Sequence, residues 1–104
     1  MLLGPSGQNI YPEELESVVN NQKYVVESLV IEDKGALVAL VYPDYKKAER
    51  DGLDRDGLQK HIEADVAVLN KEFPVYSHIK SVELLAEDFE RTPKKSIKRY
   101  LYQR

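Results

Sequence analysis

Two apolar runs separated by only four residues restrict the possible fold of this chain more than any other feature. Residues 24–31 and 36–42 are rich in β-branched and aromatic side chains, which favour strands, and Gly35 lies between the runs. This spacing predicts an antiparallel hairpin with Gly35 in its turn. Because the second run is almost entirely apolar, we expect it to be a central strand that is buried on both faces.

Two helices are expected around this hairpin. Pro12 suits a first helical turn, and the Glu residues that follow it favour the positive end of a helix, so we expect a helix over residues 12–22. A second helix that ends before Pro74 is predicted by apolar residues three or four positions apart: Leu58, Ile62, Val66, Leu69 and Phe73.

The remaining segments complete the expected architecture. Residues 2–10 indicate a tight hairpin loop, residues 44–57 a polar surface loop, and residues 79–86 a third strand. The 104 residues are enough for one domain, so we expect a single domain over residues 1–104. Its predicted class is α+β, with a small, mainly antiparallel sheet and two main helices packed on one face.

Composition excludes several kinds of site. The chain has no cysteine, and His61 and His78 are far apart in the sequence, so we expect no disulfide, thiol nucleophile or metal site. No apolar run is long enough to cross a bilayer and the first residues do not resemble a signal peptide, so the expected location is the cytoplasm.

Charge is unevenly distributed along the chain. Residues 91–104 hold six of the 15 Lys and Arg residues and none of the 18 Asp and Glu residues. Such a cationic end can attract phosphates, nucleic acid or an acidic surface, although many basic chain ends are simply solvated.

Two segments near the ends of the chain carry a more specific signal: GPSGQNIYPEELE at residues 4–16 and FERTPKKSIKR at residues 89–99. Their order and separation resemble those of the C-terminal domain of adenylate-forming acyl-CoA synthetases, and the second segment resembles the long-chain fatty acid type. The resemblance covers nearly the whole chain.

This resemblance implies a role in a larger enzyme. The C-terminal domain of such a ligase moves against its own N-terminal adenylation domain, and the complete enzyme uses ATP, Mg and coenzyme A to convert a fatty acid into its thioester. It also implies that Gly7, Gln8 and Asn9 help to shape the channel for the pantetheine arm of coenzyme A. No cofactor is expected to bind tightly to this domain alone, and nucleic acid is not an expected partner.

The tail departs from the family pattern at one position. The family usually has a catalytic lysine two residues before the Lys98-Arg99 pair, and Ser96 stands there. Three interpretations are open. Lys95 takes over the role through a shift of one residue, the enzyme adenylates poorly or performs only thioester formation, or the natural protein does not have Ser96.

Two other functions remain open from the sequence. The first is a free-standing α+β binding module that holds an anionic partner with its basic tail. The second is an inactive paralogue within the ligase family, which would account for Ser96. In every reading that places the chain in a ligase, we expect the isolated 104 residues to be inactive.

Overall fold

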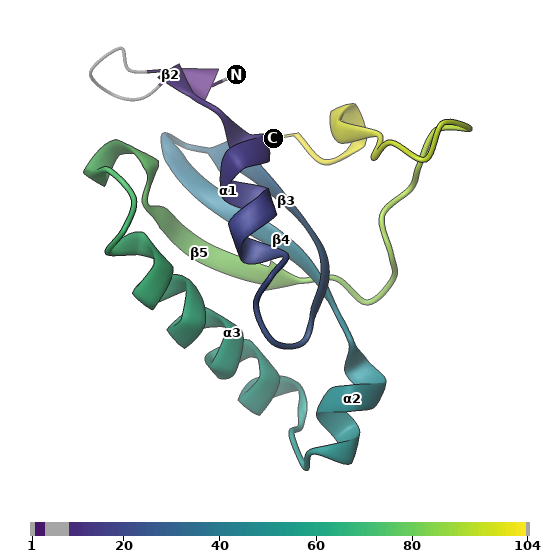
Figure 1. The fold of residues 1–104 in the computed structure, drawn as a ribbon. Coiled ribbons are helices and arrows are strands. Elements are labelled where there is room, and N and C mark those ends of the chain that lie inside the picture. Colours follow the sequence, from purple (N-terminus) through teal and green to yellow (C-terminus); the bar gives the residue numbers. More distant parts are fainter. Residues whose placement is uncertain (1, 4–8, 104) are drawn as a thin grey trace.

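The structure is a computed structural model that describes residues 2–3 and 9–103. Its main sheet has the strand order β3–β4–β5, and Figure 1 shows β4 in the middle. The strands are β3 (Val25–Asp33), β4 (Ala36–Pro43) and β5 (Ile79–Leu84). Because β4 pairs on both edges and its residues 37–41 are all buried, the expectation of a central strand is confirmed.

The two pairings of β4 differ in direction. β3 and β4 form the expected antiparallel hairpin, whereas β4 and β5 run parallel. The hairpin turn consists of Lys34 and Gly35, which both have positive φ, +53° and +80°. A two-residue loop with this backbone matches the right-handed twist of the strands, and Gly35 accommodates positive φ without strain.

Helices cover one face of the sheet. α1 (Pro12–Val19) and α3 (Arg55–Asn70) bury their apolar stripes against β3, β4 and β5, as the arrangement in Figure 1 shows. The central apolar contributors to this core are Leu15, Val19, Val30, Ala39, Val41, Leu58, Ile62, Val66 and Val82.

The structure differs from the sequence-based boundaries most clearly at residues 44–57 and at the end of the first helix. Residues 44–57 are not all loop, because they contain the short helix α2 (Tyr45–Arg50), which is capped by the Asp44 side chain and buries Ala48. α1 ends at Val19, before the approximate expected end at residue 22, and turns made of residues 20–24 connect it to β3. A cap and one small buried side chain give little periodic signal, so the sequence pattern missed α2.

The chain after β5 covers the opposite face of the sheet. Phe89 is buried there with Leu29, Ile31, Val38 and Leu40, and Ile97 and Tyr102 pack against this second cluster. A short 3-10 turn, η2 (Arg99–Leu101), lies between Ile97 and Tyr102. We call residues 88–103 the tail.

The α+β class is confirmed, with a small, mainly antiparallel sheet and its two main helices on one face. A second antiparallel pair joins β1 (Leu2–Leu3) to β2 (Asn9–Ile10), in agreement with the expected hairpin. In the part of the chain that the structure describes, no helix is long and apolar enough to cross a membrane.

Candidate functional site

The tail folds back on itself in a small antiparallel hairpin. Arg91 and Ile97 face each other in an isolated bridge, and the Lys98 N–H donates to the Glu90 carbonyl at 2.9 Å. Ile97 also packs against the second apolar cluster. The base of this hairpin therefore has a defined register on the sheet.

Residues 92–96 form the tip of the hairpin, which we call the tail turn. Both the Lys95 N–H to Thr92 carbonyl bond and the Thr92 N–H to Ser96 carbonyl bond are 2.8 Å long. Lys95 has a φ of +67°. A three-residue loop made of a tight turn and one left-handed residue has these bonds, and Pro93 suits the start of that turn.

The candidate catalytic residues lie at this tip. Lys95 and Ser96 are both exposed, as is Lys94. The Ser96 N–H also donates a weak hydrogen bond to the Thr92 hydroxyl oxygen at 3.3 Å. The tail turn thus presents two ammonium groups and one hydroxyl to solvent, a donor set suited to phosphate or carboxylate oxygens.

A buried ion pair anchors the C-terminal side of the hairpin. Both Glu16 oxygens accept from Arg99, with distances of 3.0 Å (Nη1 to Oε2) and 2.5 Å (Nη2 to Oε1). The Val30 N–H also donates to Oε2 at 2.7 Å. Glu16 is only 7% exposed, so α1 contributes a buried charge that the tail neutralises.

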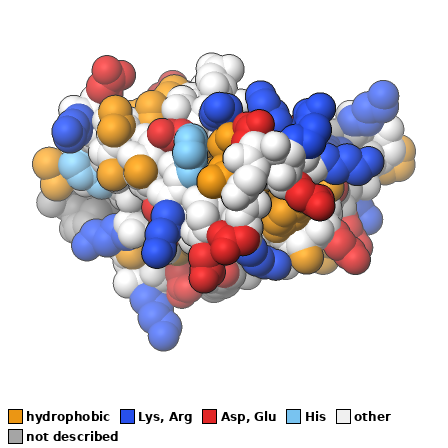
Figure 2. All heavy atoms as spheres, turned by 90° about the horizontal axis from the view of Figure 1, so that it is seen from below, with side chains coloured by type: hydrophobic (Ala, Val, Ile, Leu, Met, Phe, Trp, Pro, Cys, Tyr) orange, Lys and Arg blue, Asp and Glu red, His pale blue; other side chains and the backbone are white. Residues whose placement is uncertain are grey.

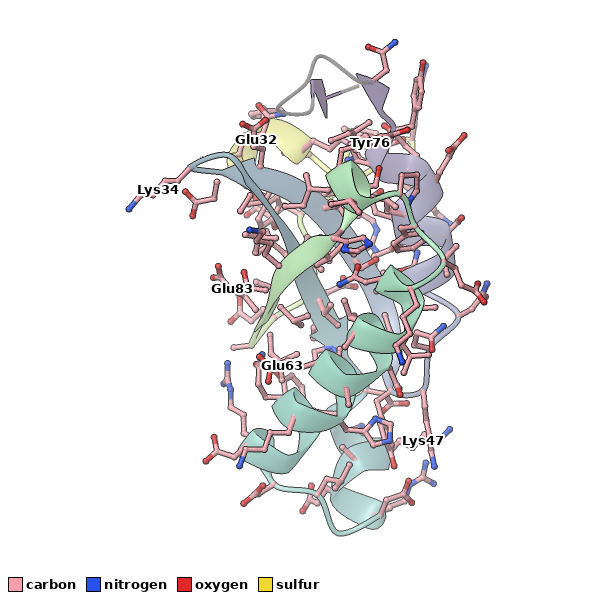
Figure 3. The ribbon with its side chains drawn as sticks, turned by 90° about the vertical axis from the view of Figure 1, so that its left-hand side faces the viewer. Glu32, Lys34, Lys47, Glu63, Tyr76 and Glu83 are labelled. Carbon is pink, nitrogen blue, oxygen red and sulfur yellow. The ribbon has the colours of Figure 1, made fainter. Side chains whose placement is uncertain are left out.

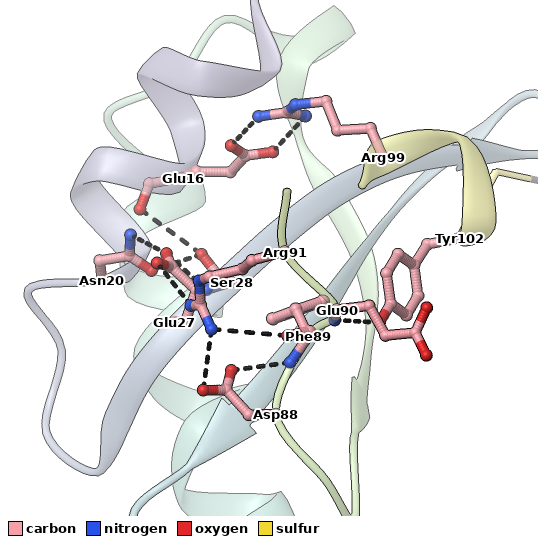
Figure 4. A network of polar contacts seen from close by, with 10 residues as sticks. All are labelled: Glu16, Asn20, Glu27, Ser28, Asp88, Phe89, Glu90, Arg91, Arg99 and Tyr102. Atoms are coloured by element: carbon pink, nitrogen blue, oxygen red, sulfur yellow. Dashed lines mark hydrogen bonds and ion pairs between the residues drawn. The ribbon is translucent and has the colours of Figure 1, made fainter. Parts of the chain in front are cut away.

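A second arginine anchors the N-terminal side. Arg91 donates to Asp88 Oδ2 at 2.9 Å and lies 3.4 Å from Glu27 Oε2 on β3. Glu27 is itself held by Asn20, whose Nδ2 donates to Oε1 at 2.8 Å. Figure 4 shows that these contacts join α1, β3 and the tail into one polar network.

The network shifts the proton equilibria of its members. Burial raises the pKa of the Glu16 carboxyl above its ordinary value, although the bonds from Arg99 and Val30 oppose this shift. The bond to Glu16 raises the pKa of Arg99, and the bond to Asp88 raises the pKa of Arg91. Both guanidinium groups therefore stay charged.

The other candidate segment lies elsewhere on the molecule. Asn9 is exposed at the start of β2, whereas Gly7 and Gln8 lie outside the described residues. Asn9 borders a groove of about 470 Å³, whose apolar walls include Tyr11, Leu15, Phe73 and Tyr76. Figure 3 shows Tyr76 beside the N-terminal end of α1.

The two candidate segments are not brought together. In Figure 1 the tail turn projects to the right of the sheet, away from β2 at the top. Seen from below in Figure 2, Lys and Arg side chains gather toward that same right-hand end. The described part of the chain thus offers a cationic tip and a separate groove.

Comparison with known proteins assigns the family. The family model of the AMP-binding enzyme C-terminal domain matches residues 2–104. The chain belongs to this family. No curated protein sequence matches the chain significantly.

Several solved structures contain a region whose fold is similar to that of this AMP-binding enzyme C-terminal domain. A Mycobacterium tuberculosis fatty acyl CoA synthetase is 25% identical, with a TM-score of 0.68 over 98% of this chain and 18% of that chain. A benzoate CoA ligase from Burkholderia xenovorans LB400 is 17% identical, with a TM-score of 0.67 over 91% of this chain and 18% of that chain. Apo MatB from Rhodopseudomonas palustris is 22% identical, with a TM-score of 0.65 over 92% and 18%. The chain therefore spans less than a fifth of these proteins.

The sequence alone did not identify the acidic residues that pair with the tail. Glu16 lies between Leu15 and Val19 on the buried face of α1. A charged residue within an apolar stripe was a usable signal, because burial of an unpaired carboxylate is costly. Its partner, Arg99, is 83 residues away, so no local pattern identified the pair.

Proposed function

We propose that this domain is the C-terminal part of an ATP-dependent, AMP-forming ligase that joins a fatty acid to coenzyme A. The observation that carries the proposal is the family match over residues 2–104, which the similarity to a fatty acyl CoA synthetase supports. We also propose that residues 1–104 form one domain, whose main partner is the N-terminal adenylation domain of the same enzyme. The cytoplasmic location stays a prediction.

The proposed reaction has two steps. A carboxylate oxygen attacks the α-phosphorus of ATP, which forms an acyl-adenylate and releases pyrophosphate. The thiol of coenzyme A then attacks the acyl carbon and AMP leaves. A domain that rotates between two poses presents a different surface to each step. The tail turn lies apart from β2, which carries Asn9 of the groove, and this separation is consistent with two such surfaces.

The tail turn is proposed to serve adenylation. Charged donors placed near the carboxylate and the α-phosphate stabilise the charge that develops during transfer. Ser96 occupies the position of the family lysine and supplies only a neutral hydroxyl. Lys95 is the adjacent ammonium, and its left-handed backbone places it at the tip.

Lys95 is proposed to act from its present backbone position. A shift of one residue would move Ile97 away from the apolar cluster that it contacts, because neighbouring residues of a strand point to opposite faces. The ladder bonds on both sides of the tail turn oppose the same shift.

Two alternative functions were considered from the sequence. Ser96 is the one feature that favours an adenylation-deficient paralogue. The free-standing anion-binding module is disfavoured because Arg91 and Arg99 are already paired with carboxylates.

The groove beside Asn9 is proposed to serve thioester formation. The pantetheine arm of coenzyme A carries amides on a flexible chain. A groove with mainly apolar walls and the polar side chains of Asn9, Glu14 and Ser77 suits such a group. Gly7, Gln8 and Asn9 are the proposed contacts.

No magnesium site is proposed within the described residues of this domain. Within residues 2–3 and 9–103, no group of three or more His, Asp or Glu side chains is placed to hold a metal ion. The described residues do not fit a bound Mg ion.

Restoring the family lysine tests the proposal. In the complete enzyme, Ser96→Lys should increase ATP–pyrophosphate exchange with a fatty acid by roughly 10²-fold if Ser96 limits adenylation, because loss of one preorganised donor costs about this factor. Lys95→Ala should abolish the remaining exchange of the unmodified enzyme if Lys95 substitutes for the missing group. The isolated 104 residues should show no exchange. A complete enzyme in which neither the unmodified nor the Ser96→Lys form exchanges pyrophosphate or forms a thioester would contradict the proposed function.

A further inference from the structure

Each side of the tail turn is joined to the body of the domain by one arginine. Arg91 directly precedes the turn and contacts Glu27 on β3, and Arg99 follows it and binds Glu16 on α1. Between them, the turn projects into solvent, and the hydrogen bonds described for residues 92–96 join these residues to one another. The direction of the turn therefore depends on how its two ends are held.

We propose that Glu16 and Glu27 are positioning residues, which hold the tail turn through Arg99 and Arg91 in the orientation that adenylation requires. This inference rests on the proposed function, but Glu16 and Glu27 lie outside both the tail turn and the proposed coenzyme A contacts at residues 7–9. Neither carboxylate is proposed to touch a substrate.

Glu16 meets the geometric requirement for such a role. A bidentate arginine–carboxylate pair fixes both distance and plane, unlike a single contact to a lysine. The Val30 N–H fixes the carboxylate in turn, since it donates to the same Oε2 atom that Arg99 Nη1 reaches. The position of the Arg99 guanidinium is thus fixed relative to both α1 and β3.

Glu27 is positioned by a different set of contacts. The Asn20 side-chain amide donates to Glu27 Oε1, and its Oδ1 atom accepts from the Ser28 hydroxyl at 2.7 Å. Oε2 of Glu27 is left facing Arg91. Figure 4 shows this arrangement, with Asp88 on the other side of the same guanidinium.

Packing below the turn couples the Arg99–Glu16 pair to the Arg91–Glu27 pair. Phe89 and Tyr102 meet edge to face with ring centroids 5.1 Å apart, and the Tyr102 hydroxyl accepts from the Glu90 N–H at 2.8 Å. These contacts keep the two strands of the tail side by side. A loss of either acidic partner therefore tilts the hairpin as a unit, which alters the place of residues 94–96.

The test separates the two half-reactions in the complete enzyme. Glu16→Gln keeps an oxygen for the Val30 N–H but removes the buried charge that faces Arg99. Glu27→Gln keeps an oxygen for Asn20 but removes the charge on β3 that faces Arg91. We expect each variant to lower kcat for ATP–pyrophosphate exchange by at least tenfold and up to about 10²-fold, the range that small misplacements produce. Conversion of supplied acyl-adenylate to the thioester should change less than twofold.

Controls distinguish positioning from loss of folding. Glu63→Gln changes an exposed carboxylate on α3, labelled in Figure 3, and should leave both half-reactions unchanged. Arg99→Lys keeps the charge but not the bidentate geometry, so its exchange rate should fall between those of the unmodified enzyme and Glu16→Gln. Hydrogen exchange should be faster at the Thr92 and Lys98 amides in both acidic-residue variants.

The activity of Glu27→Gln determines whether the positioning role is correct. Equal losses in both half-reactions by a folded Glu27→Gln enzyme, or unchanged exchange in that variant, would overturn the proposal. If Glu16→Gln unfolds, the half-exposed Glu27 decides alone. If the unmodified enzyme adenylates too slowly to measure, Ser96→Lys serves as the parent. Absence of exchange in that parent too would count against the proposed function, whereas exchange that survives Glu27→Gln counts against positioning only.

Discussion

At the scale of single residues, Tyr24 has the most unusual surroundings outside the tail. It is a buried residue with a φ of +68°, a backbone region that tyrosine rarely adopts. Its hydroxyl donates to Asp51 Oδ2 at 2.6 Å, and its ring meets His61 edge to face. Tyr24 thereby joins the start of β3 to the end of α2 and to α3.

The bond from Tyr24 lowers the pKa of Asp51 below its ordinary value of 3.8. A carboxyl with a lowered pKa in the folded state contributes stability that is present above its unfolded pKa and is lost as the pH falls through the folded pKa. In Tyr24→Phe, we expect the pKa of Asp51 to return toward 3.8 and the loss of stability below about pH 4 to become shallower. Carboxyl-carbon NMR titration and denaturant unfolding at several pH values measure these two effects.

Tyr45→Phe is the matched control, because the Tyr45 hydroxyl donates to the Leu85 carbonyl and to no carboxylate. It should lower the free energy of unfolding without a change in the titration of Asp51. An unchanged Asp51 pKa in Tyr24→Phe would refute the assignment.

At the scale of elements, α3 shows how one face of a helix carries the stability. Ile62 is fully buried between α3 and the sheet, whereas Val68 on the same helix is 61% exposed. Removal of methyl and methylene groups from a close-packed core loses contacts that the neighbours recover only in part.

We therefore expect Ile62→Ala to lower the free energy of unfolding by about 2–5 kcal/mol. Val68→Ala should change it by less than about 0.5 kcal/mol, since an exposed side chain loses little burial. Urea unfolding followed by circular dichroism makes the comparison. Similar losses for the two variants would show that α3 does not pack on the sheet as described.

At the scale of the whole molecule, both faces of the sheet need a cover. α1 and α3 cover one face, and the tail covers Leu29, Ile31, Val38 and Leu40 on the other. The tail is therefore a structural layer as well as the carrier of the candidate catalytic turn. These two roles are linked, because Ile97 and Arg99 adjoin the turn and also contact the body.

Removal of residues 88–104 should expose this second apolar cluster. We expect the shortened chain to bind a dye such as ANS, to unfold at a lower temperature and to associate at micromolar concentration, as large exposed apolar patches do. Light scattering and thermal unfolding measure the change. As a control, Tyr100→Ser alters an exposed tail residue and should leave these properties unchanged. A shortened chain that remains monomeric with unchanged unfolding would show that the tail is not part of the core.

Local signals in the sequence were sufficient for much of this architecture. Strand-forming runs around Gly35 determined the hairpin, and the spacing from Leu58 to Val66 determined the buried face of α3, because side-chain direction follows backbone period. The resemblance of the tail motif likewise marked Lys95 and Ser96 as the candidate residues. These features depend on residues that are close together along the chain.

Only the tertiary structure decided the rest. The parallel pairing of β5 with β4, the cover that the tail gives to the second sheet face, and the Glu16–Arg99 pair all join segments that are distant in sequence. α2 was missed because a single cap and one small buried residue resemble a polar loop. Long-range packing and charge pairing select among partners that no local period can identify, and for this reason the residues that hold the candidate turn emerged only with the fold.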